Sequence, residues 1–570
     1  MNVSRTVRRS TPGPCVTALV LLATTFILAL SRLAGATTIN ANSASLSDVA
    51  AAIASATDGD IVIIPGGMST WTRTLSVKKA IELRGAGVGN TIIKDNASSG
   101  YLILWDLRGT TNQKARLTGI EIQDGGFTGQ LYRIRVLSSN TNGSTFRWDH
   151  SKWNNAKGVA LNPDTVFGVC DHVDFFAPNY VDFIRPMATE WDGHGYGDGS
   201  WNKPPNFGSS EFFFIEDCTF HWPAGVYGPV TDAFNGARFV VRHCTVYDGS
   251  IQSHGTESSG RLRGTRAIEA YNNTFVGTNL NKFLGLGRFG SAVAHGNHAS
   301  GYVGDNACFA GSNYRAIETF AVFGGADGTN VWDKNDTTGG PGHNGIYFSG
   351  TAASASSGQT VTVSGSPGWT PNQWATGGYV LRRTSNVCGV TTITFGSITG
   401  NTSNTISYSG TIHSAPMTFC AGDTLEIRKV ILIMDQIGAG EGSLVGGDTP
   451  KPPPTWNDEV AQPVYCWNNT NEFGHPINYQ ATLSQNQISG IHFINGVARP
   501  GYTPYIYPHP LVSGAALPLL PSPAATRTSL RRPWGGKKQQ KTEELEKKTR
   551  KKVKQNPANE RVESQEKLGN

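Results

Sequence analysis

The chain has 570 residues, of which 38% are hydrophobic and 16% charged, and it contains 68 glycines and 29 prolines. This composition is typical of a β- and turn-rich globular protein built as one elongated domain with additions. The formal charge of +6 is unevenly spread: the first 36 residues contribute +4 and the segment from Arg527 onward +8, which leaves about −6 for the body. The charge therefore gives no support to a nucleic-acid partner for the folded part.

The N-terminus has the order of a secretory signal. Three arginines precede an apolar run from Val16 to Leu30, and Ala34-Gly35-Ala36 follows as an A-x-A cleavage site. The apolar run is short for a membrane span. We therefore predict a signal peptide over 1–36, secretion to the extracellular space or the periplasm, and no integral membrane span.

Residues 37–95 are predicted to form a cap and the first strands. SLSDVAAAIASATDGD has the spacing of small apolar residues typical of a helix, and DIVIIPGG follows as a strand ended by proline and glycine. A helix here would cover the open end of a stack of strands. Together with the following LRGAG, this run is similar to the N-terminal segment of secreted right-handed parallel β-helix proteins of the pectate-lyase-like superfamily.

VCDHV at 169–173 also resembles the W-I-D-H phrase of family 1 pectate lyases, with Cys170 in place of isoleucine. The R-x-P-x-x-R signature and the calcium-binding aspartates of that family are not recognisable in this sequence. The resemblance implies a β-helix and a polysaccharide substrate.

An insertion rich in glycine, aromatic and acidic residues follows, ATEWDGHGYGDGSWNKPPN. The triplet around His194 resembles the G-H-G phrase of polygalacturonases, without the N-T-D and D-D phrases that precede it in that family. We expect Trp191 and His194 to contact a sugar. Asp192 and Asp198 offer oxygen ligands that would suit Ca²⁺, but we predict no metal site and expect no cofactor.

Between Glu211 and His298 one phrase recurs four times, as EFFFIEDCTF, ARFVVRHCTV, TRAIEAYNNTF and GSAVAHGNHAS. The copies align at spacings of 26, 29 and 24 on Cys218, Cys244, Asn273 and Asn297. A period in the twenties with one strand-like phrase per repeat indicates a solenoid. We therefore predict an all-β parallel β-helix over 37–345, and the resemblance implies its right-handed form.

The phrase alternates with period 2, which separates an inward from an outward face. Inward columns begin at Phe213 and Ile215, and the outward column comprises Glu216, Arg242, Tyr271 and His295. Stacked parallel strands lie about 4.8 Å apart, so the outward side chains would form one continuous ladder. Loops leaving equivalent corners of the coils would wall a groove beside it.

The loop between Ser253 and Tyr271 has the densest set of reactive side chains. On an acidic polysaccharide, arginines would pair with uronate carboxylates, and a base near the C5 proton would begin β-elimination. Histidine is the side chain that ordinarily exchanges a proton near neutral pH, so His254 is the expected base, whereas the resemblance implies an arginine, Arg242 or Arg263. The predicted catalytic residues are Arg242, His254, Glu257 and Arg263. The predicted substrate-binding residues are Glu216, Asp232, Arg261, Arg266, Glu269, Tyr271, Trp191, His194 and His295.

From 346 to 428 the phrase stops, and alternating runs such as TVTVSG and YVLRRT predict an inserted antiparallel β module. Cys388 and Cys420 bracket part of this segment and are the expected disulfide pair. Cys218 and Cys244 occupy equivalent places in successive coils, so they are expected to stack as thiols.

β-Helix coils are predicted to return over 429–515, and GYTPYIYPHPL in this range resembles the closing segment of secreted bacterial β-helix proteins. A Pro/Ala/Ser linker and a Lys/Glu-rich tail occupy 516–570. Their lack of apolar residues predicts disorder or a lone solvated helix.

Three functions remain open from the sequence. The leading one is a lyase that cleaves acidic, uronate-containing glycans by β-elimination. The second is a glycoside hydrolase, whose paired carboxylates would come from Glu216, Asp232, Glu257 and Glu269 and would be recognised by their separation. The third is a non-catalytic, adhesin-like surface protein that only binds glycan. For each we expect a monomer with an acidic polysaccharide as its partner.

Overall fold

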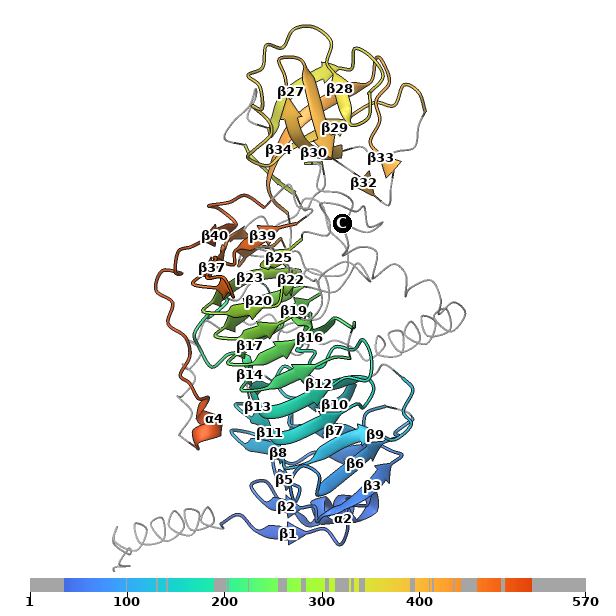
Figure 1. Cartoon of the computed structure of the whole chain (residues 1–570), viewed down its shortest axis with the longest axis vertical. Helices are drawn as coiled ribbons and strands as arrows, with labels where there is room; N and C mark the ends of the chain where they lie inside the picture. The colour runs from blue at the N-terminus through green and yellow to red at the C-terminus, as the bar shows by residue number, and fades with distance from the viewer. Residues whose placement is uncertain are drawn as a thin grey trace, which may run out of the picture. The chain divides into compact units, whose positions relative to one another are not determined.

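Figure 1 shows a computed structural model of the chain. The residues it describes are 35–514, except 99, 130–131, 140–141, 189–200, 202–203, 224, 255–263, 278–282, 303–306, 313–327, 330–332, 338–343, 390–394, 410, 413–414, 434–435, 442–458 and 483–486. The chain divides into two compact units, Met1–Pro518 and Leu519–Asn570. Most of the predicted signal peptide and the basic tail lie outside the described residues.

The described structure is nearly all β, and its largest part is a 20-stranded sheet whose pairings are parallel. This sheet contains two ranks of strands, each stacked in chain order (Figure 1). The first rank comprises β1 (Thr38–Asn40), β2 (Ile61–Ile63), β5 (Glu82–Arg84), β8 (Lys114–Thr118), β11 (Thr145–Asn154), β13 (Phe167–Phe176), β14 (Phe213–Glu216), β17 (Arg238–Arg242), β20 (Thr265–Tyr271), β23 (Phe289–His295), β37 (Val464–Trp467) and β40 (Phe493–Asn495). The second rank comprises β3 (Gly67–Trp71), β6 (Thr91–Asp95), β9 (Glu121–Asp124), the second halves of β11 and β13, β15 (Thr219–His221), β18 (Thr245–Tyr247), β21 (Thr274–Val276), β24 (His298–Ser300) and β38 (Thr470–Asn471).

Two further parallel sheets make a third face. One contains β4 (Leu75–Val77), β7 (Ile103–Asp106), β10 (Tyr132–Leu137) and β12 (Val159–Asp164), and the other β16 (Gly228–Ala233), β19 (Gly249–Ser253), β22 (Phe283–Gly287), β25 (Cys308–Gly311) and β39 (Tyr479–Ala481). The chain visits a first-rank, a second-rank and a third-face strand in turn, as in β17, β18 and β19 followed by β20, β21 and β22. This arrangement of long parallel sheets is compatible with a parallel β-helix.

The register of the repeated phrase is confirmed. Glu216 lies opposite Arg242, Arg242 opposite Tyr271, and Tyr271 opposite His295. The predicted inward columns are buried in one continuous apolar core, beginning at Phe213 and Ile215. The alternation of apolar and polar residues in the phrase therefore fixed which side chains enter the core.

An internal ladder of short side chains joins the coils at the corner between the two ranks. Cys218 and Cys244 are buried free thiols, as predicted. At the equivalent places Asn273 donates from its backbone N and its Nδ2 to Asn297 Oδ1, at 3.0 and 2.9 Å. Asn297 repeats both bonds to Asn469 Oδ1. Each asparagine thereby satisfies buried backbone groups of the neighbouring coil, which lowers the cost of burying the corner.

The residue before this ladder has a positive φ in one coil after another. His243, Asn272, Gly296 and Asn468 have φ of 54°, 55°, 65° and 52°. The left-handed region favours glycine and, among other residues, Asn, Asp and His. The corner therefore selects the residue types that occupy this column.

Helix α2 (Leu46–Ser55) is confirmed at the N-terminal end. Ser45 caps it by accepting a hydrogen bond from the backbone N of Asp48 at 3.2 Å. Val49, Ala52 and Ile53 are buried in the core of the stack. An amphipathic helix thus covers apolar side chains at the first coils.

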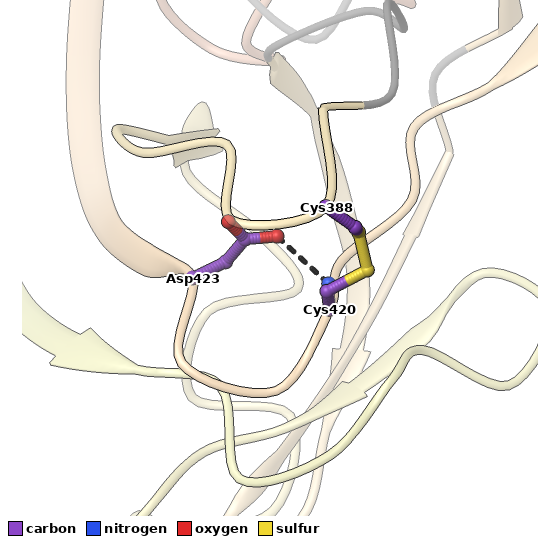
Figure 2. A group of neighbouring side chains, drawn as sticks. All are labelled: Cys388, Cys420 and Asp423. Atoms are coloured by element: carbon purple, nitrogen blue, oxygen red, sulfur yellow. Dashed lines mark hydrogen bonds between the residues drawn. A yellow bond between two sulfur atoms is a disulfide. The ribbon is translucent and has the colours of Figure 1, made fainter.

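A smaller antiparallel sheet has an apolar core of its own, which includes Trp374 and Ile427. Its strands are β26 (Asp333–Asn335), β27 (Ile346–Thr351), β28 (Thr360–Thr362), β29 (Tyr379–Arg383), β30 (Phe395–Asn401), β31 (Thr405–Ser409) and β34 (Thr424–Ile433). Two short antiparallel pairs are β32 (Thr411–Ile412) with β33 (Ala415–Pro416), and β35 (Ala439–Gly440) with β36 (Val460–Ala461). The predicted disulfide between Cys388 and Cys420 is present beside Asp423 (Figure 2).

Candidate functional site

The outer face of the first rank between β11 and β20 is covered by the segment 499–514, which ends in α4 (Pro510–Ser513) (Figure 1). Later residues of the segment contact earlier strands of the stack. Tyr502 donates to Glu269 at 2.6 Å, and Arg147 donates to the Leu511 carbonyl at 2.9 Å. We call this segment the C-terminal strap.

Arg242 lies beneath the strap and is fully buried. Its Nη2 is 2.5 Å from Glu216 Oε2, and its Nη1 donates to Tyr271 OH at 2.9 Å. It also donates to the strap carbonyls of Tyr505 and Ile506, at 2.8 and 2.9 Å. The expectation that this ladder lines an open groove is therefore wrong, because another part of the chain packs on it and gives Arg242 a stapling role.

The remaining members of the covered face are also enclosed. Glu269 accepts from Tyr502 and from the backbone N of Gly208, and burial raises the pKa of its carboxyl to about 7. His295 stacks between Tyr271 and Trp467, with ring centroids 4.8 and 4.5 Å apart. Burial lowers the pKa of His295 to about 4, so this ring is neutral at physiological pH.

A second outward row crosses the third face and is only partly covered. Ile184 bridges Leu161 on one side and Thr231 on the other, so Arg185 lies between Asn162 of β12 and Asp232 of β16. Arg135 of β10 is opposite Asn162. Five successive strands or segments thus contribute to one row, which comprises Arg135, Asn162, Arg185, Asp232 and Gln252.

Asp232 joins this row to His254, which follows β19. The His254 Nδ1 is hydrogen-bonded to Asp232 Oδ1, and 44% of the histidine side chain is exposed. Arg185 donates from Nη2 to Asp232 Oδ2 at 3.0 Å and from Nε to Asp182 Oδ2 at 2.8 Å. One arginine therefore holds two carboxylates beside a solvent-facing imidazole.

The pKa values of the Asp182 and Asp232 carboxyl groups are shifted in opposite directions. Burial works to raise the pKa of Asp232, but His254 and Arg185 more than offset it and hold this pKa below its usual range. Burial raises the pKa of Asp182 despite Arg185, and the negative charge of Asp232 adds to the rise. Carboxyl groups whose pKa values are driven apart in this way are typical of acid–base sites.

Aromatic and cationic side chains continue the row toward β7. Two guanidinium groups lie near the Tyr132 ring, with Arg135 Cζ at 5.8 Å and Arg185 Cζ at 5.7 Å from its centroid. Arg135 donates to Tyr101 OH and to Asp164 Oδ2, each at 2.8 Å. Rings and guanidinium groups of this kind can contact both the faces and the carboxylates of uronate sugars.

The structure therefore separates the predicted site residues. It brings Asp232 and His254 together on the third face, and Glu216, Arg242, Glu269, Tyr271 and His295 together under the strap. Arg266 is buried elsewhere, where its Nη2 donates to Gln462 Oε1. Trp191, His194, Glu257, Arg261 and Arg263 lie outside the described residues.

Arg135, Asp182 and Arg185 were missed from the sequence. The alternation in YRIRVL marks Arg135 as an outward residue of a strand, but the prediction followed only the phrase strands. Asp182 and Arg185 fall in VDFIRP, just before the long insertion, where no strand was expected. The isolated bridges of Ile184 supply the register that the sequence pattern lacks.

No family model matches the chain, and no curated protein matches it. Among solved structures it is similar to an alginate lyase from Paenibacillus sp. str. FPU-7, with 14% sequence identity and a TM-score of 0.29. The match covers 48% of this chain and 93% of that one. In the part of the chain that the structure describes, no helix has the length and apolar character needed to cross a membrane.

Proposed function

We propose that the protein is a secreted lyase that cleaves an acidic, uronate-containing polysaccharide on its third face, at Asp232, His254 and Arg185. The observation that carries the proposal is the exposed His254 ring, which is hydrogen-bonded through Nδ1 to Asp232, whose other carboxylate oxygen accepts from Arg185. A base, a cation for the substrate carboxylate and nearby aromatic rings are the groups that this reaction needs.

In the proposed reaction Arg185 or Arg135 pairs with the uronate carboxylate, which makes the adjacent C5 proton more acidic. His254 takes that proton, and the electron pair of the C5–H bond forms the C4=C5 double bond. The C4–O bond breaks, and the departing oxygen takes up a proton from the solvent, to which His254 later returns the proton that it took. Asp232 stabilises the imidazolium that forms on His254. The elimination consumes neither water nor an oxidant.

We also propose the fold that holds this site and the export of the chain. We propose that the stacked strands form a right-handed parallel β-helix over 37–345 and 429–515, that 346–428 is an inserted module, and that residues 1–36 direct export. The N-terminal sequence of the exported chain should begin after Ala36. An exported chain that retains residues 1–36 would refute the signal-peptide part.

The test is a screen of the full chain on pectate, alginate and glycosaminoglycans, with and without calcium or a chelator. We expect release of an unsaturated uronide, seen by its ultraviolet absorbance, on at least one substrate. His254→Asn should lower kcat by at least ~100-fold, whereas His298→Asn, at an exposed histidine of β24, should leave kcat unchanged. Absence of unsaturated product on all of these substrates would refute the lyase.

A glycoside hydrolase is the second candidate, because Asp182 and Asp232 flank one arginine and have opposite pKa shifts. Among the carboxylates named from the sequence, Asp232 lies on the third face, whereas Glu216 and Glu269 are buried under the strap. New reducing ends without unsaturated product would favour this candidate. Glycan binding without either product would favour a binding protein.

A further inference from the structure

The corner column described above contains a pair of exposed histidines on the early coils. Asp149 of β11 is opposite Asp171 of β13, and Ser151 is opposite Val173, so His150 and His172 are direct neighbours. Their rings are stacked, with centroids 5.0 Å apart and planes within 4°. The side chains are 60% and 46% exposed.

A buried carboxylate stands behind each ring. His172 Nδ1 is 2.9 Å from Asp171 Oδ2, and His150 Nδ1 is 3.5 Å from Asp149 Oδ2. Both aspartates are fully buried. Because each Nδ1 faces its carboxylate, each Nε2 lies on the opposite side of its ring. The two Nε2 atoms therefore belong to adjacent, parallel and oriented imidazoles.

The carboxylates are held in place by arginines. Arg147 Nη2 lies 2.8 Å from Asp171 Oδ2 and 2.7 Å from Asp149 Oδ2, and Arg116 Nη2 lies 2.6 Å from Asp149 Oδ2. These contacts balance the charge of the aspartates. They leave the carboxylates as fixed acceptors for histidine Nδ1–H, an arrangement that orients metal-binding imidazoles in proteins.

We propose that His150 and His172 together bind one divalent transition-metal ion, of the class that prefers imidazole, through their Nε2 atoms. Imidazole ligands suit Cu²⁺, Ni²⁺ and Zn²⁺ rather than Ca²⁺ or Mg²⁺. Metal–nitrogen bonds of about 2.0–2.1 Å need the two nitrogens roughly 3 Å apart, so the rings must tilt toward each other. Their exposure on the solvent side allows this movement.

The next member of the same column adds negative charge to the site. Asp171 is opposite Glu216 and Asp174 is opposite Thr219, which places Asp217 beside His172. Asp217 Oδ1 accepts a hydrogen bond from Tyr507 OH at 2.8 Å. A carboxylate one coil away favours a bound cation. This site is separate from the third face and does not depend on the proposed lyase.

Residues at equivalent positions of the corner column show which substitutions the corner should tolerate. Asn272 and Asn468 occupy equivalent corner positions with positive φ, so His150→Asn and His172→Asn should keep the corner intact, whereas alanine would be strained there. His298→Asn is the matched control, since His298 is an exposed histidine of the same stack outside this column.

The experiment titrates Cu²⁺ and Zn²⁺ into the full chain, purified without a histidine tag, by calorimetry. We expect the wild type and His298→Asn each to bind one metal ion per chain with high affinity. His150→Asn and His172→Asn should each lower the affinity for this metal ion by at least ~10-fold, because chelation needs both rings. The Cu²⁺ electron paramagnetic resonance spectrum should show coupling to two imidazole nitrogens, reduced in each column variant.

Retention of this high-affinity binding in either column variant would overturn the proposal. Bound metal should also protect both histidines of the wild-type chain from diethyl pyrocarbonate, as mapped by peptide mass spectrometry. This measurement does not depend on how the variants fold. Equal modification of both rings with and without metal would overturn the proposal as well.

Discussion

Replacing Arg242 by alanine tests whether this residue staples the strap or acts in catalysis. The change would leave the buried Glu216 carboxylate without its cation and would remove the donor of two strap carbonyls. Breaking one side of a buried ion pair costs about 3–5 kcal/mol. We therefore expect Arg242→Ala to lower the free energy of unfolding by about that amount.

The assay is denaturant unfolding of the full chain followed by tryptophan fluorescence, together with limited proteolysis of the strap. Arg84→Ala is the matched control, because Arg84 pairs with Glu82 on the same face but is 44% exposed, so this variant should stay within about 0.5 kcal/mol of the wild type. The double variant Glu216→Gln with Arg242→Met should lose less stability than Arg242→Ala, since it leaves no unpaired charge.

If Arg242 instead acts in catalysis, Arg242→Ala should lose activity without losing stability. If Arg242→Ala unfolds at the same denaturant concentration as Arg84→Ala while its folded form has lost activity, the stapling argument is refuted. The structure predicts that the folded fraction keeps its activity per molecule, because Arg242 is enclosed by Glu216, Tyr271 and the strap.

Other predictions concern Glu269, the strap and the disulfide. Because the carboxyl of Glu269 loses its proton near pH 4.5 in the unfolded chain and near pH 7 in the folded one, stability should fall by about 3 kcal/mol as the pH rises through this window. Glu269→Gln should remove this fall in pH-dependent unfolding, and an unchanged slope would contradict the assignment. Deleting 501–514 should expose the apolar cluster around Phe214 and Val240 and increase the binding of a hydrophobic dye; unaltered dye binding would count against the strap. Replacing both Cys388 and Cys420 by serine removes a disulfide that closes a loop with a sequence separation of 32, and it should lower the free energy of unfolding by roughly 2–4 kcal/mol. An unchanged thermal midpoint of unfolding of the 346–428 module would contradict this prediction.

Most of the stack could be predicted because its signals are local and repeated. The four copies of the phrase place Glu216, Arg242, Tyr271 and His295 at equivalent positions, and the register follows from that equivalence. The Cys/Asn column was recognised as one position for the same reason. Period 2 within the phrase then separates the core face from the outer face.

The covering of that outer face could not be predicted. Period 2 shows that Arg242 points away from the core, but it says nothing about which other segment packs there. The carbonyl that Arg242 bonds belongs to Tyr505, 263 residues later in the chain. The cluster of Arg242 with Glu216 and Tyr271 looked reactive in the sequence because a buried staple and an active site use the same residue types.

The pairing of the arginines is our reason for proposing the third face, and not the covered face, as the place where an anionic substrate would bind. Under the strap each carboxylate of an ion pair is matched to a buried guanidinium, as in Glu216 with Arg242, and a substrate would have to displace the strap to reach it. Arg185 is 24% exposed and is shared by two carboxylates. Since the pKa of Asp182 is raised, protonation of this carboxyl when a uronate arrives would release one side of Arg185 to the substrate. Asp182→Asn should therefore lower KM for an acidic glycan without abolishing kcat, and an increase in KM would argue that Asp182 positions Arg185 for the substrate.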